Sequence, residues 1–392
     1  MQNYSTRQLR PALLVTYFAA CMVFLPQVEA SAYSTKAELG QALYFDTSLS
    51  LNRTQSCSTC HDPNKGFIDG RDNGVEGAVS LGDDGKSLGD RNAPTASYAS
   101  VSPAFHKNQK GQYIGGQFLD GREKDLKGQA GGPPLNPIEM NMPSKAAVAD
   151  RLKENTKYIS TFKNLFGADI VGNSEKLYSA MTESIAAFEK TDFFAPFDSK
   201  YDRYLRGEYK MTKMEDLGMT LFFSKQFTNC NLCHQLKRSQ TAEGETFSNY
   251  EYHNIGTPVN TAVRAVNGVA KDHIDHGLLA NPAVDDPTQD GKFKVPTLRN
   301  IAVTGPYMHN GVFKDLRTVV LFYNKYNSRS AKRQINPETN NKWRSPEVAE
   351  NISIKELETG PALKNKEIDA LVAFMKTLTD KRYEHLLSNS ME

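Results

Sequence analysis

Apolar residues recur three and four positions apart in two long segments of the chain, residues 177–191 and 366–380. This spacing places them on one face of an α-helix, so both segments are predicted to be helices with one buried face. Alternating runs of β-branched residues are scarce, and glycine, proline and asparagine interrupt long stretches such as residues 71–95. The pattern therefore predicts a mainly α-helical protein with long loops.

A third helix is predicted to begin near Asp315, within the stretch TGPYMHNGVFKDLRTVVLFYNKYN. Helical periodicity would place these side chains on its inward face: Leu316, Val319, Val320 and Tyr323. Tyr323 would then be either a core residue with its hydroxyl bonded to the backbone or a side chain that reaches a buried ligand. The periodicity alone leaves both possibilities open.

The first 30 residues have the pattern of a secretory signal peptide. A basic head with Arg7 and Arg10 precedes an apolar run, and residues 28–30 form a small-residue cleavage pattern. The run is broken by Pro26 and falls short of the roughly 20 apolar residues that a membrane span needs. Hydrophobic residues continue past Cys21, which disfavours acylation of that cysteine. The mature protein is therefore predicted to be periplasmic and without a membrane span.

Charge and length narrow the class of protein further. The chain has 47 basic and 45 acidic residues, and the predicted cleavage would remove two of the former and one of the latter. This balance argues against nucleic acid or an anionic membrane as a partner. With 39% hydrophobic residues, the mature chain can form two cored domains. We place them at residues 31–205 and 206–392, with the boundary region at residues 193–212.

Every cysteine that remains after the signal segment belongs to a C-x-x-C-H motif. The two motifs consist of Cys57, Cys60 and His61, and of Cys230, Cys233 and His234. Disulfides, a redox dithiol or a shared zinc site could use the same cysteines, but none of them requires a histidine after each second cysteine. Two thioether bonds to a porphyrin and an adjacent imidazole ligand to its iron do require it. The sequence thus predicts two covalently bound c-type haems.

The surroundings of the two motifs match. Leu39-Gly40-x-x-Leu43-Tyr44-Phe45 precedes the first and Leu217-Gly218-x-x-Leu221-Phe222-Phe223 the second, and Ala93-Pro94-Thr95 corresponds to Val295-Pro296-Thr297. Each half also closes on one of the two long predicted helices. The fold class predicted is mainly α, with two cytochrome c-like haem domains related by duplication.

The second axial ligand decides between electron transfer and chemistry at each iron. After His61 the next histidine is His106, and no methionine occurs before Met140. The first haem is therefore predicted to keep an open face that can bind peroxide. At the second haem, Tyr323 and Met308 compete: a phenolate favours high oxidation states, whereas a thioether raises the reduction potential.

The order of the motifs carries a family resemblance. ELGQALYFD, CSTCH, RNAPT, GGQFLDGR, NPIEM, CNLCH, FKVPTLRN, GPYMHNG and FYN follow one another along the chain. Over nearly the whole mature length this resembles the bacterial dihaem cytochrome c peroxidase family, and within it the MauG-type enzymes. The resemblance implies an oxidoreductase that uses hydrogen peroxide, or dioxygen plus electrons, to oxidise tryptophans of a methylamine dehydrogenase precursor during tryptophan tryptophylquinone maturation. The alternatives are hydrogen peroxide reduction with a small redox donor protein and a non-enzymatic dihaem electron carrier.

The resemblance also implies roles for residues of the first site. His61 would be the proximal ligand of a high-spin, peroxide-reactive haem. Glu139, within NPIEM, would be the distal general acid and base. Gln129 and Pro133 match residues that shape the same pocket.

At the second site, the resemblance implies that His234 and Tyr323 ligate a six-coordinate haem used for electron transfer. Tyr323 stands where ordinary peroxidases of the family carry methionine. Asn92, Asp285 and Pro287 match an inter-haem calcium site, where oxygen ligands suit a hard cation.

Two positions depart from the MauG-type pattern. Leu119 stands where those enzymes carry a tryptophan between the haems, and Thr228 where they carry a surface tryptophan before the second motif. The only tryptophan of the chain is Trp343, so inter-haem exchange would have to tunnel directly or use Phe118. Residues 273–276 have a metal-like histidine spacing but are predicted to be surface residues in a polar loop.

Overall fold

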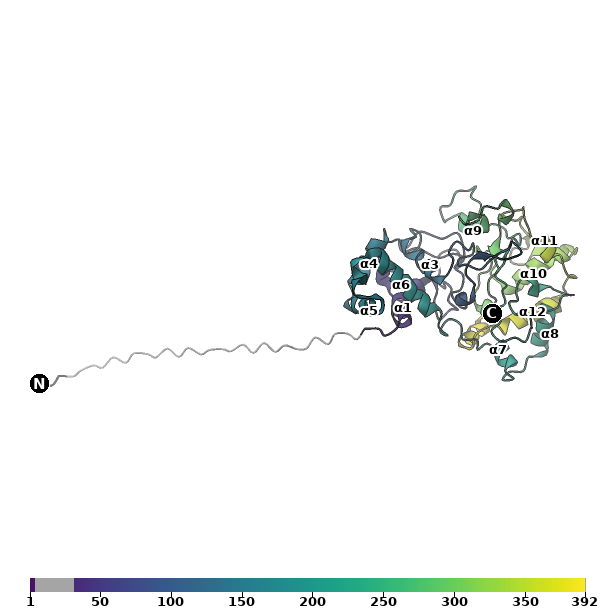
Figure 1. Ribbon diagram of the computed structural model, residues 1–392. Helices are drawn as coiled ribbons and strands as arrows, with labels where there is room; N and C mark the ends of the chain where they lie inside the picture. Colours follow the sequence, from purple (N-terminus) through teal and green to yellow (C-terminus); the bar gives the residue numbers. More distant parts are fainter. Residues whose placement is uncertain (4–31, 392) are drawn as a thin grey trace. The chain divides into compact units, whose positions relative to one another are not determined.

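The computed structural model describes residues 1–3 and 32–391 of the chain (Figure 1). The residues from Ala32 onward form one compact unit. Nearly all of the predicted signal peptide, Cys21 included, lies outside the described residues. Within the described part, no helix combines the length and the apolar character needed to cross a bilayer.

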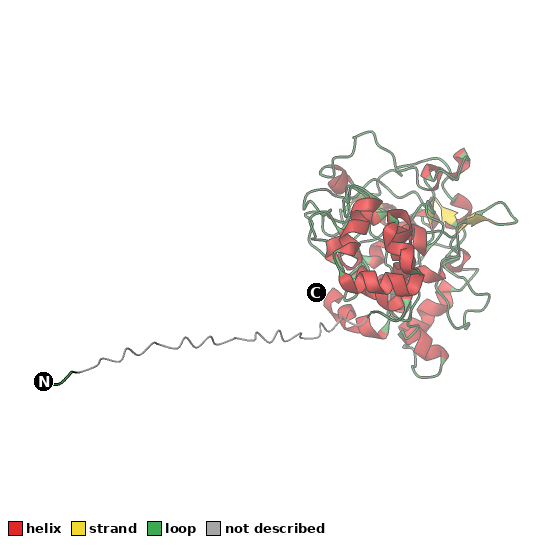
Figure 2. Cartoon of the chain, turned by 60° about the vertical axis from the view of Figure 1, so that its left-hand side comes forward, coloured by secondary structure: helices red, strands yellow, loops and turns green. Residues whose placement is uncertain are grey.

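Helices and long loops make up most of this unit, as Figure 2 shows. The helices are α1 (Lys36–Tyr44), α2 (Cys57–Cys60), α3 (Leu126–Ala130), α4 (Lys145–Lys153), α5 (Thr156–Phe166), α6 (Ser174–Glu189), α7 (Lys200–Leu205), α8 (Lys213–Phe222), α9 (Thr261–Arg264), α10 (Leu316–Asn327), α11 (Ile354–Leu357) and α12 (Asn365–Lys376). Short strands pair antiparallel as β1 (His106–Lys107) with β2 (Tyr113–Ile114), β3 (Tyr252–His253) with β4 (Phe293–Lys294), and β5 (Ile335–Asn336) with β6 (Asn341–Lys342). The predicted mainly α class is confirmed.

The three helices expected from periodicity are α6, α10 and α12. The Asn173 side chain caps α6 by accepting a hydrogen bond from the Lys176 amide, and Asp315 caps α10 by accepting one from the Arg317 amide. Each cap satisfies an amide that has no partner within its helix. The prediction that a helix begins next to Asp315 is confirmed.

Two helix pairs, α1 with α6 and α8 with α12, cross at glycines. A Cβ atom on Gly40 would lie 1.9 Å from the Ser184 carbonyl oxygen, and one on Gly218 would lie 1.9 Å from the Ala370 carbonyl oxygen. Only glycine permits such a close approach of one backbone to another. The glycines of the matched Leu-Gly motifs thus set the closest point of both pairs.

Two hydrophobic clusters form the interior. The first draws mainly on residues before 195, among them Leu39, Leu43, Tyr44, Leu177, Met181, Ile185, Phe188 and Phe194. The second draws on residues from 201 onward, among them Leu221, Phe222, Phe247, Phe322, Ile368, Leu371 and Phe374. The division into domains at residues 205 and 206 stays a prediction, since the residues from Ala32 onward form one compact unit. In Figure 1, α1, α3, α4, α5 and α6 gather apart from α7, α8, α10, α11 and α12.

Buried polar groups also hold the interior together. Within the segment from residue 201 onward, Arg299 is completely buried and forms an ion pair with Asp202 at 2.5 Å. The Asp380 carboxylate accepts hydrogen bonds from the Tyr98 hydroxyl at 2.5 Å and from the Asn300 side-chain amide at 2.8 Å. Their burial makes these bonds costly to lose.

Candidate haem sites

The second C-x-x-C-H motif opens onto a cavity of about 370 Å³. Cys230 and Cys233 line it together with His234 and Tyr323. The apolar side chains that line it include Phe222, Val295, Leu298, Val319, Val320, Leu371 and Met375. The structure therefore brings the predicted cofactor-binding residues of the second site together in one largely apolar space.

The His234 ring is held with one nitrogen free. Its Nδ1 lies 3.1 Å from the carbonyl oxygen of Phe247, and burial lowers the pKa of the imidazole to about 4. The ring is therefore neutral at neutral pH, and because a carbonyl only accepts, Nδ1 must carry the proton. This leaves the Nε2 lone pair available for a metal.

Helix α10 presents its predicted face to the same cavity. The lining residues that it contributes include Leu316, Val319, Val320 and Tyr323, so the predicted inward orientation is confirmed. Met308 also lines the cavity, from the loop that precedes α10. Both predicted candidates for the sixth ligand thus lie on the cavity wall. Burial raises the pKa of the Tyr323 phenol, so only a nearby cation would make its phenolate stable.

The four cysteines are free thiols rather than disulfides. Burial raises the pKa of Cys57 and of Cys230. It raises the pKa of Cys60 to about 12. Redox-active cysteines have lowered pKa values, so a dithiol of the thioredoxin kind does not fit. Within residues 1–3 and 32–391, no group of three or more histidine, cysteine or acidic side chains is arranged to hold a metal, which removes the shared zinc site.

The first motif repeats the arrangement of the second. His61 Nδ1 lies 3.2 Å from the carbonyl oxygen of Phe67, and burial lowers the pKa of the ring. Cys57 packs against the first hydrophobic cluster. Each motif thus offers a neutral imidazole with its outer nitrogen bonded to a main-chain oxygen, which orients the ring and fixes its tautomer.

The predicted catalytic residues of the first site come from one continuous segment. Gln129 lies on α3, Pro133 begins the following 3₁₀ turn, and Glu139 follows that turn. The Pro133 carbonyl accepts a hydrogen bond from the amide of Met140, and the Gln129 carbonyl accepts one from the amide of Gly132. These bonds tie the segment into one compact loop.

Glu139 is half-buried in that loop. Burial raises the pKa of its carboxyl group, opposed by the Arg122 guanidinium and a hydrogen bond with Asn136. Its charge acts on the thiols of Cys57 and Cys60, so the carboxyl lies beside the first motif. A carboxyl with a raised pKa is suited to both accepting and returning a proton.

Another carboxyl near the first motif was not identified from the sequence. Glu189, the last residue of α6, is 6% exposed, and its Oε2 atom has no hydrogen-bond partner among the described residues. Burial raises the pKa of Glu189 to about 8, and its charge acts on the Cys57 thiol. This buried carboxyl could have been predicted from the sequence, because Glu189 follows Ile185 by four positions and so lies on the apolar face of the same helix.

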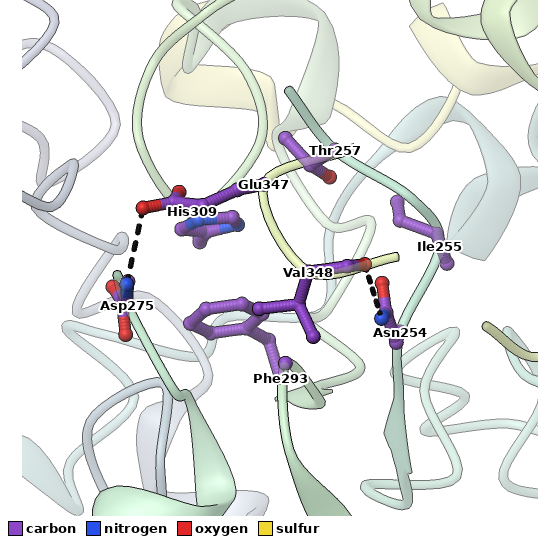
Figure 3. Close-up of a pocket in the computed structure, with 9 residues that line it drawn as sticks. Asn254, Ile255, Thr257, Asp275, Phe293, His309, Glu347 and Val348 are labelled. Atoms are coloured by element: carbon purple, nitrogen blue, oxygen red, sulfur yellow. Dashed lines mark hydrogen bonds between the residues drawn. The ribbon is translucent and has the colours of Figure 1, made fainter. Parts of the chain in front are cut away.

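A small pocket of about 10 Å³, room for one water molecule, adjoins the large cavity (Figure 3). The His309 ring stacks on Phe293 with centroids 3.7 Å apart, and both residues line the two spaces. The Glu347 side chain accepts a hydrogen bond from the Asp275 amide at 3.0 Å, drawn as a dashed line in Figure 3. This pocket is a packed wall of the cavity and has no room for a substrate.

Three residues match a calcium site through the family resemblance. Asn92 lines the large cavity and donates a hydrogen bond to the Ala78 carbonyl. Asp285 and Pro287 are exposed, and the Pro287 carbonyl accepts a hydrogen bond from Asn351. Calcium binding by these residues stays a prediction.

The polar loop at residues 273–276 is a surface feature, as predicted. His273 and His276 are exposed, and His276 Nδ1 lies 2.8 Å from Asp290. Asp275 is buried and pairs with Arg91 at 2.7 Å. The two histidines and the aspartate therefore serve separate contacts.

The second site fits a c-type haem. Cysteine and imidazole groups stand at its edge, a ligand-bearing helix faces them, and apolar side chains line the space between. The Tyr250 hydroxyl belongs to a residue of the cavity lining and has no hydrogen-bond partner among the described residues. Buried polar atoms without partners are rare in proteins, and polar groups of a bound cofactor would satisfy them.

These features define a class of protein. The sequence profile of the di-haem cytochrome c peroxidase family matches residues 34–210. The methylamine utilization protein MauG of Paracoccus denitrificans is 55% identical to this chain over 90% of this chain and 91% of its own length. The chain belongs to the di-haem cytochrome c peroxidase family, whose members are haem oxidoreductases, and the family implies two haems c.

Other relatives agree. The cytochrome c551 peroxidase of Nitrosomonas europaea is 31% identical over 88% of this chain and 79% of its own. The diheme peroxidase BthA of Burkholderia thailandensis has the same fold, with a TM-score of 0.78 and 31% identity over 90% of this chain and 88% of that one. The chain is thus similar both to a MauG protein and to peroxidases.

Proposed function

We propose that this protein is a periplasmic di-haem oxidase of the MauG type, which uses hydrogen peroxide equivalents to oxidise tryptophans of a methylamine dehydrogenase precursor. One observation carries the proposal: Tyr323 lies on the wall of the cavity that His234 borders. The 55% identity to a methylamine utilization protein supports the same function. We also propose that the two sites arose by duplication, which the equivalent glycine contacts and the equivalent histidine–carbonyl pairs support.

The second site would hold a haem between His234 and Tyr323, attached through Cys230 and Cys233. A bound haem c supplies an iron with two axial positions and reversible oxidation. His234 presents Nε2 because its other nitrogen is bonded to a main-chain oxygen. Tyr323 contributes a hard oxygen donor whose phenolate is stabilised only next to positive charge, so its affinity rises with the oxidation state of the metal.

The first site would bind peroxide beside Glu139. This carboxyl group takes a proton from the near oxygen of hydrogen peroxide and returns it to the leaving oxygen. Its raised pKa makes the return favourable, and the Arg122 charge keeps enough of the ionised form for the first transfer. Gln129 and Pro133, held in the same loop, limit the space around the carboxyl and exclude bulk water.

Peroxide reduction with a small redox donor protein is the second candidate function. Met308 favours it, because this thioether lines the same cavity as Tyr323. Leu119 and Thr228 favour it as well, since both line the cavity where MauG-type enzymes carry tryptophan. The non-enzymatic carrier is excluded by membership of an oxidoreductase family.

We also propose a calcium site held by Asn92, Asp285 and Pro287 through side-chain or carbonyl oxygens, as a hard cation prefers. Electron paramagnetic resonance before and after calcium chelation tests this. A Asn92→Ala variant that responds to the chelator as the parent does would disprove the assignment.

The electron paramagnetic resonance spectrum of the ferric holoprotein tests the main proposal. We expect one high-spin and one low-spin signal; two low-spin signals would contradict an open first site. Tyr323→His should keep both haems but lose the stable two-electron-oxidised state after peroxide, seen in absorption spectra. Tyr326→Phe is the matched control, because this tyrosine lies on the same helix and donates to the Ile255 carbonyl at 2.9 Å. Identical peroxide spectra for Tyr323→His and the parent would remove Tyr323 from the mechanism.

The substrate is tested separately. Incubation with methylamine dehydrogenase precursor and hydrogen peroxide should generate the quinone absorbance of the mature cofactor. Oxidation of a reduced small cytochrome by peroxide, with no quinone formed, would instead establish the peroxidase function.

A further inference from the structure

Tyr98 and Asp380 form a buried phenol–carboxylate pair. Each is 1% exposed, and the Tyr98 hydroxyl donates to Asp380 Oδ1 at 2.5 Å. The Asn300 amide donates to the other carboxylate oxygen at 2.8 Å. A hydrogen bond this short to a carboxylate is strong and aligns the phenolic proton with a base.

The pair lies next to the support of the first histidine. The Tyr98 amide donates to the Phe194 carbonyl at 3.1 Å, and the Phe194 ring stacks on Phe67 with centroids 4.5 Å apart. The carbonyl oxygen of Phe67 holds the His61 ring. Two residues in contact with each other, Phe194 and Phe67, thus connect Tyr98 with His61.

Contacts also connect the pair with the second site. The Arg299 guanidinium lies 5.3 Å from the centre of the Tyr98 ring and 5.4 Å from that of Phe247. The carbonyl oxygen of Phe247 holds the His234 ring. Tyr98 also lines the cavity that His234 borders, so the phenol stands between the two candidate haem sites.

Tyr98 has left-handed backbone, as several other aromatic residues of this chain do. Tyr98 has φ of 59° at the start of one 3₁₀ turn, and Asn300 has φ of 61° at the start of another. Both side chains donate to Asp380. Left-handed backbone suits asparagine and is strained for a bulky aromatic residue. An asparagine at position 98 could also have donated a hydrogen bond, but only a phenol can be oxidised by one electron.

We propose that Tyr98 is a redox-active tyrosine that accepts an oxidising equivalent from the peroxide-oxidised protein. Tyr98 loses one electron and its phenolic proton; the proton moves along the hydrogen bond to Asp380, and a neutral tyrosyl radical remains. The electron returns to the haem pair, from which hydrogen peroxide, taking up two protons from solvent, has removed two electrons in becoming two molecules of water. The second oxidising equivalent stays on the haem pair.

This inference rests on the proposed function, because it needs peroxide to oxidise the protein. It supplies an oxidisable side chain between the two sites, where Leu119 cannot serve since an aliphatic chain has no accessible oxidised state. The tyrosyl radical is uncharged once the proton has moved, so Arg299 does not repel it. The Arg299 charge favours the ionised form of Asp380, but burial outweighs it and raises the pKa of this carboxyl to about 6.

Freeze-quench electron paramagnetic resonance of the holoprotein after one equivalent of hydrogen peroxide tests the proposal. We expect a tyrosyl radical signal that narrows when tyrosine is ring-deuterated. Tyr98→Phe keeps the ring and should lose the signal; Asp380→Asn keeps a hydrogen-bonding group but cannot take the proton, and should lose most of it. Tyr252→Phe is the control, since this buried hydroxyl donates to the Gly115 carbonyl at 2.6 Å and has no carboxylate partner.

The outcomes separate the two levels of inference. Loss of the ferric haem signals without any tyrosyl radical would overturn the role of Tyr98 and leave the proposed function intact. A radical of equal yield in Tyr98→Phe would do the same. Ferric signals that peroxide leaves unchanged in the parent would overturn the proposed function itself. Loss of the radical in Tyr98→Phe, with the ferric signals still responding to peroxide, would support Tyr98.

Discussion

Replacing Gly40 or Gly218 by alanine tests the closest contacts in the fold. A methyl group on Gly40 would lie 1.9 Å from the Ser184 carbonyl oxygen, and one on Gly218 would lie 1.9 Å from the Ala370 carbonyl oxygen. Real Cβ atoms essentially never approach within 3.0 Å of such an atom. Each substitution must therefore move one helix away from its partner by at least the difference, 1.1 Å.

The cost follows from that displacement. A gap of about 1 Å forfeits roughly a quarter to a half of the dispersion energy of each facing contact, and overpacked interfaces cost about 1–3 kcal/mol or more. We take about 3–4 kcal/mol for the helix separation. Alanine recovers about 1 kcal/mol of helix propensity relative to glycine. The expected net loss is about 2–3 kcal/mol in unfolding free energy, and it is the same for both variants because their contacts match.

Urea unfolding of the holoprotein, followed by far-ultraviolet circular dichroism, measures this loss. Gly172→Ala is the control, since a Cβ there meets nothing within 4 Å; it should be neutral or stabilise by up to about 1 kcal/mol. If Gly40→Ala and Gly218→Ala unfold at the same urea concentration as Gly172→Ala, the close-packing argument is wrong. A large loss in only one of them would refute the equivalence of the two helix pairs.

Three further predictions concern carboxyl groups. Glu139→Gln should slow the reaction with hydrogen peroxide by about 10²–10⁴-fold in stopped-flow absorbance, and an unchanged rate would end its acid–base role. Because the folded-state pKa of Glu189 is raised from 4.5 to about 8, its contribution to stability is complete below pH 4.5 and is lost as the pH rises to about 8. At about 1.4 kcal/mol per pKa unit, unfolding free energy should fall over that range by about 3–5 kcal/mol more in the parent than in Glu189→Gln, and equal falls would contradict the raised pKa. Arg299→Met should destabilise by about 3–5 kcal/mol, because it leaves the Asp202 charge buried and unpaired; the double variant Arg299→Met with Asp202→Asn should recover part of the loss, and no recovery would contradict the pairing.

Periodicity was sufficient to predict the long helices and the orientation of Tyr323. Both depend on local spacing, because residues three and four apart share a helix face whatever the tertiary fold. The glycine contacts could not be predicted, because they depend on the tertiary fold and not on local spacing. Gly40 and Gly218 were visible as parts of repeated motifs, but nothing in the sequence indicates that each faces a carbonyl oxygen more than 140 residues further along the chain.

The residues of the candidate sites also fall into two groups, those in local motifs and those that only the fold brings together. C-x-x-C-H is a local motif, so Cys57, Cys230 and their neighbours could be identified from the sequence. The pairing of Tyr98 with Asp380 joins residues that are 282 positions apart, and no local pattern signals it.

Both proximal imidazoles are bonded to main-chain oxygens, those of Phe67 and Phe247. A peptide carbonyl is present whichever amino acid occupies its position, so no single side-chain replacement deletes this acceptor. Amino-acid substitutions at positions 67 and 247 therefore leave the hydrogen bond to each ring, and its effect on the electron-donating strength of that ring, in place. Side-chain substitutions elsewhere in each site can therefore accumulate while His61 and His234 keep the same acceptor.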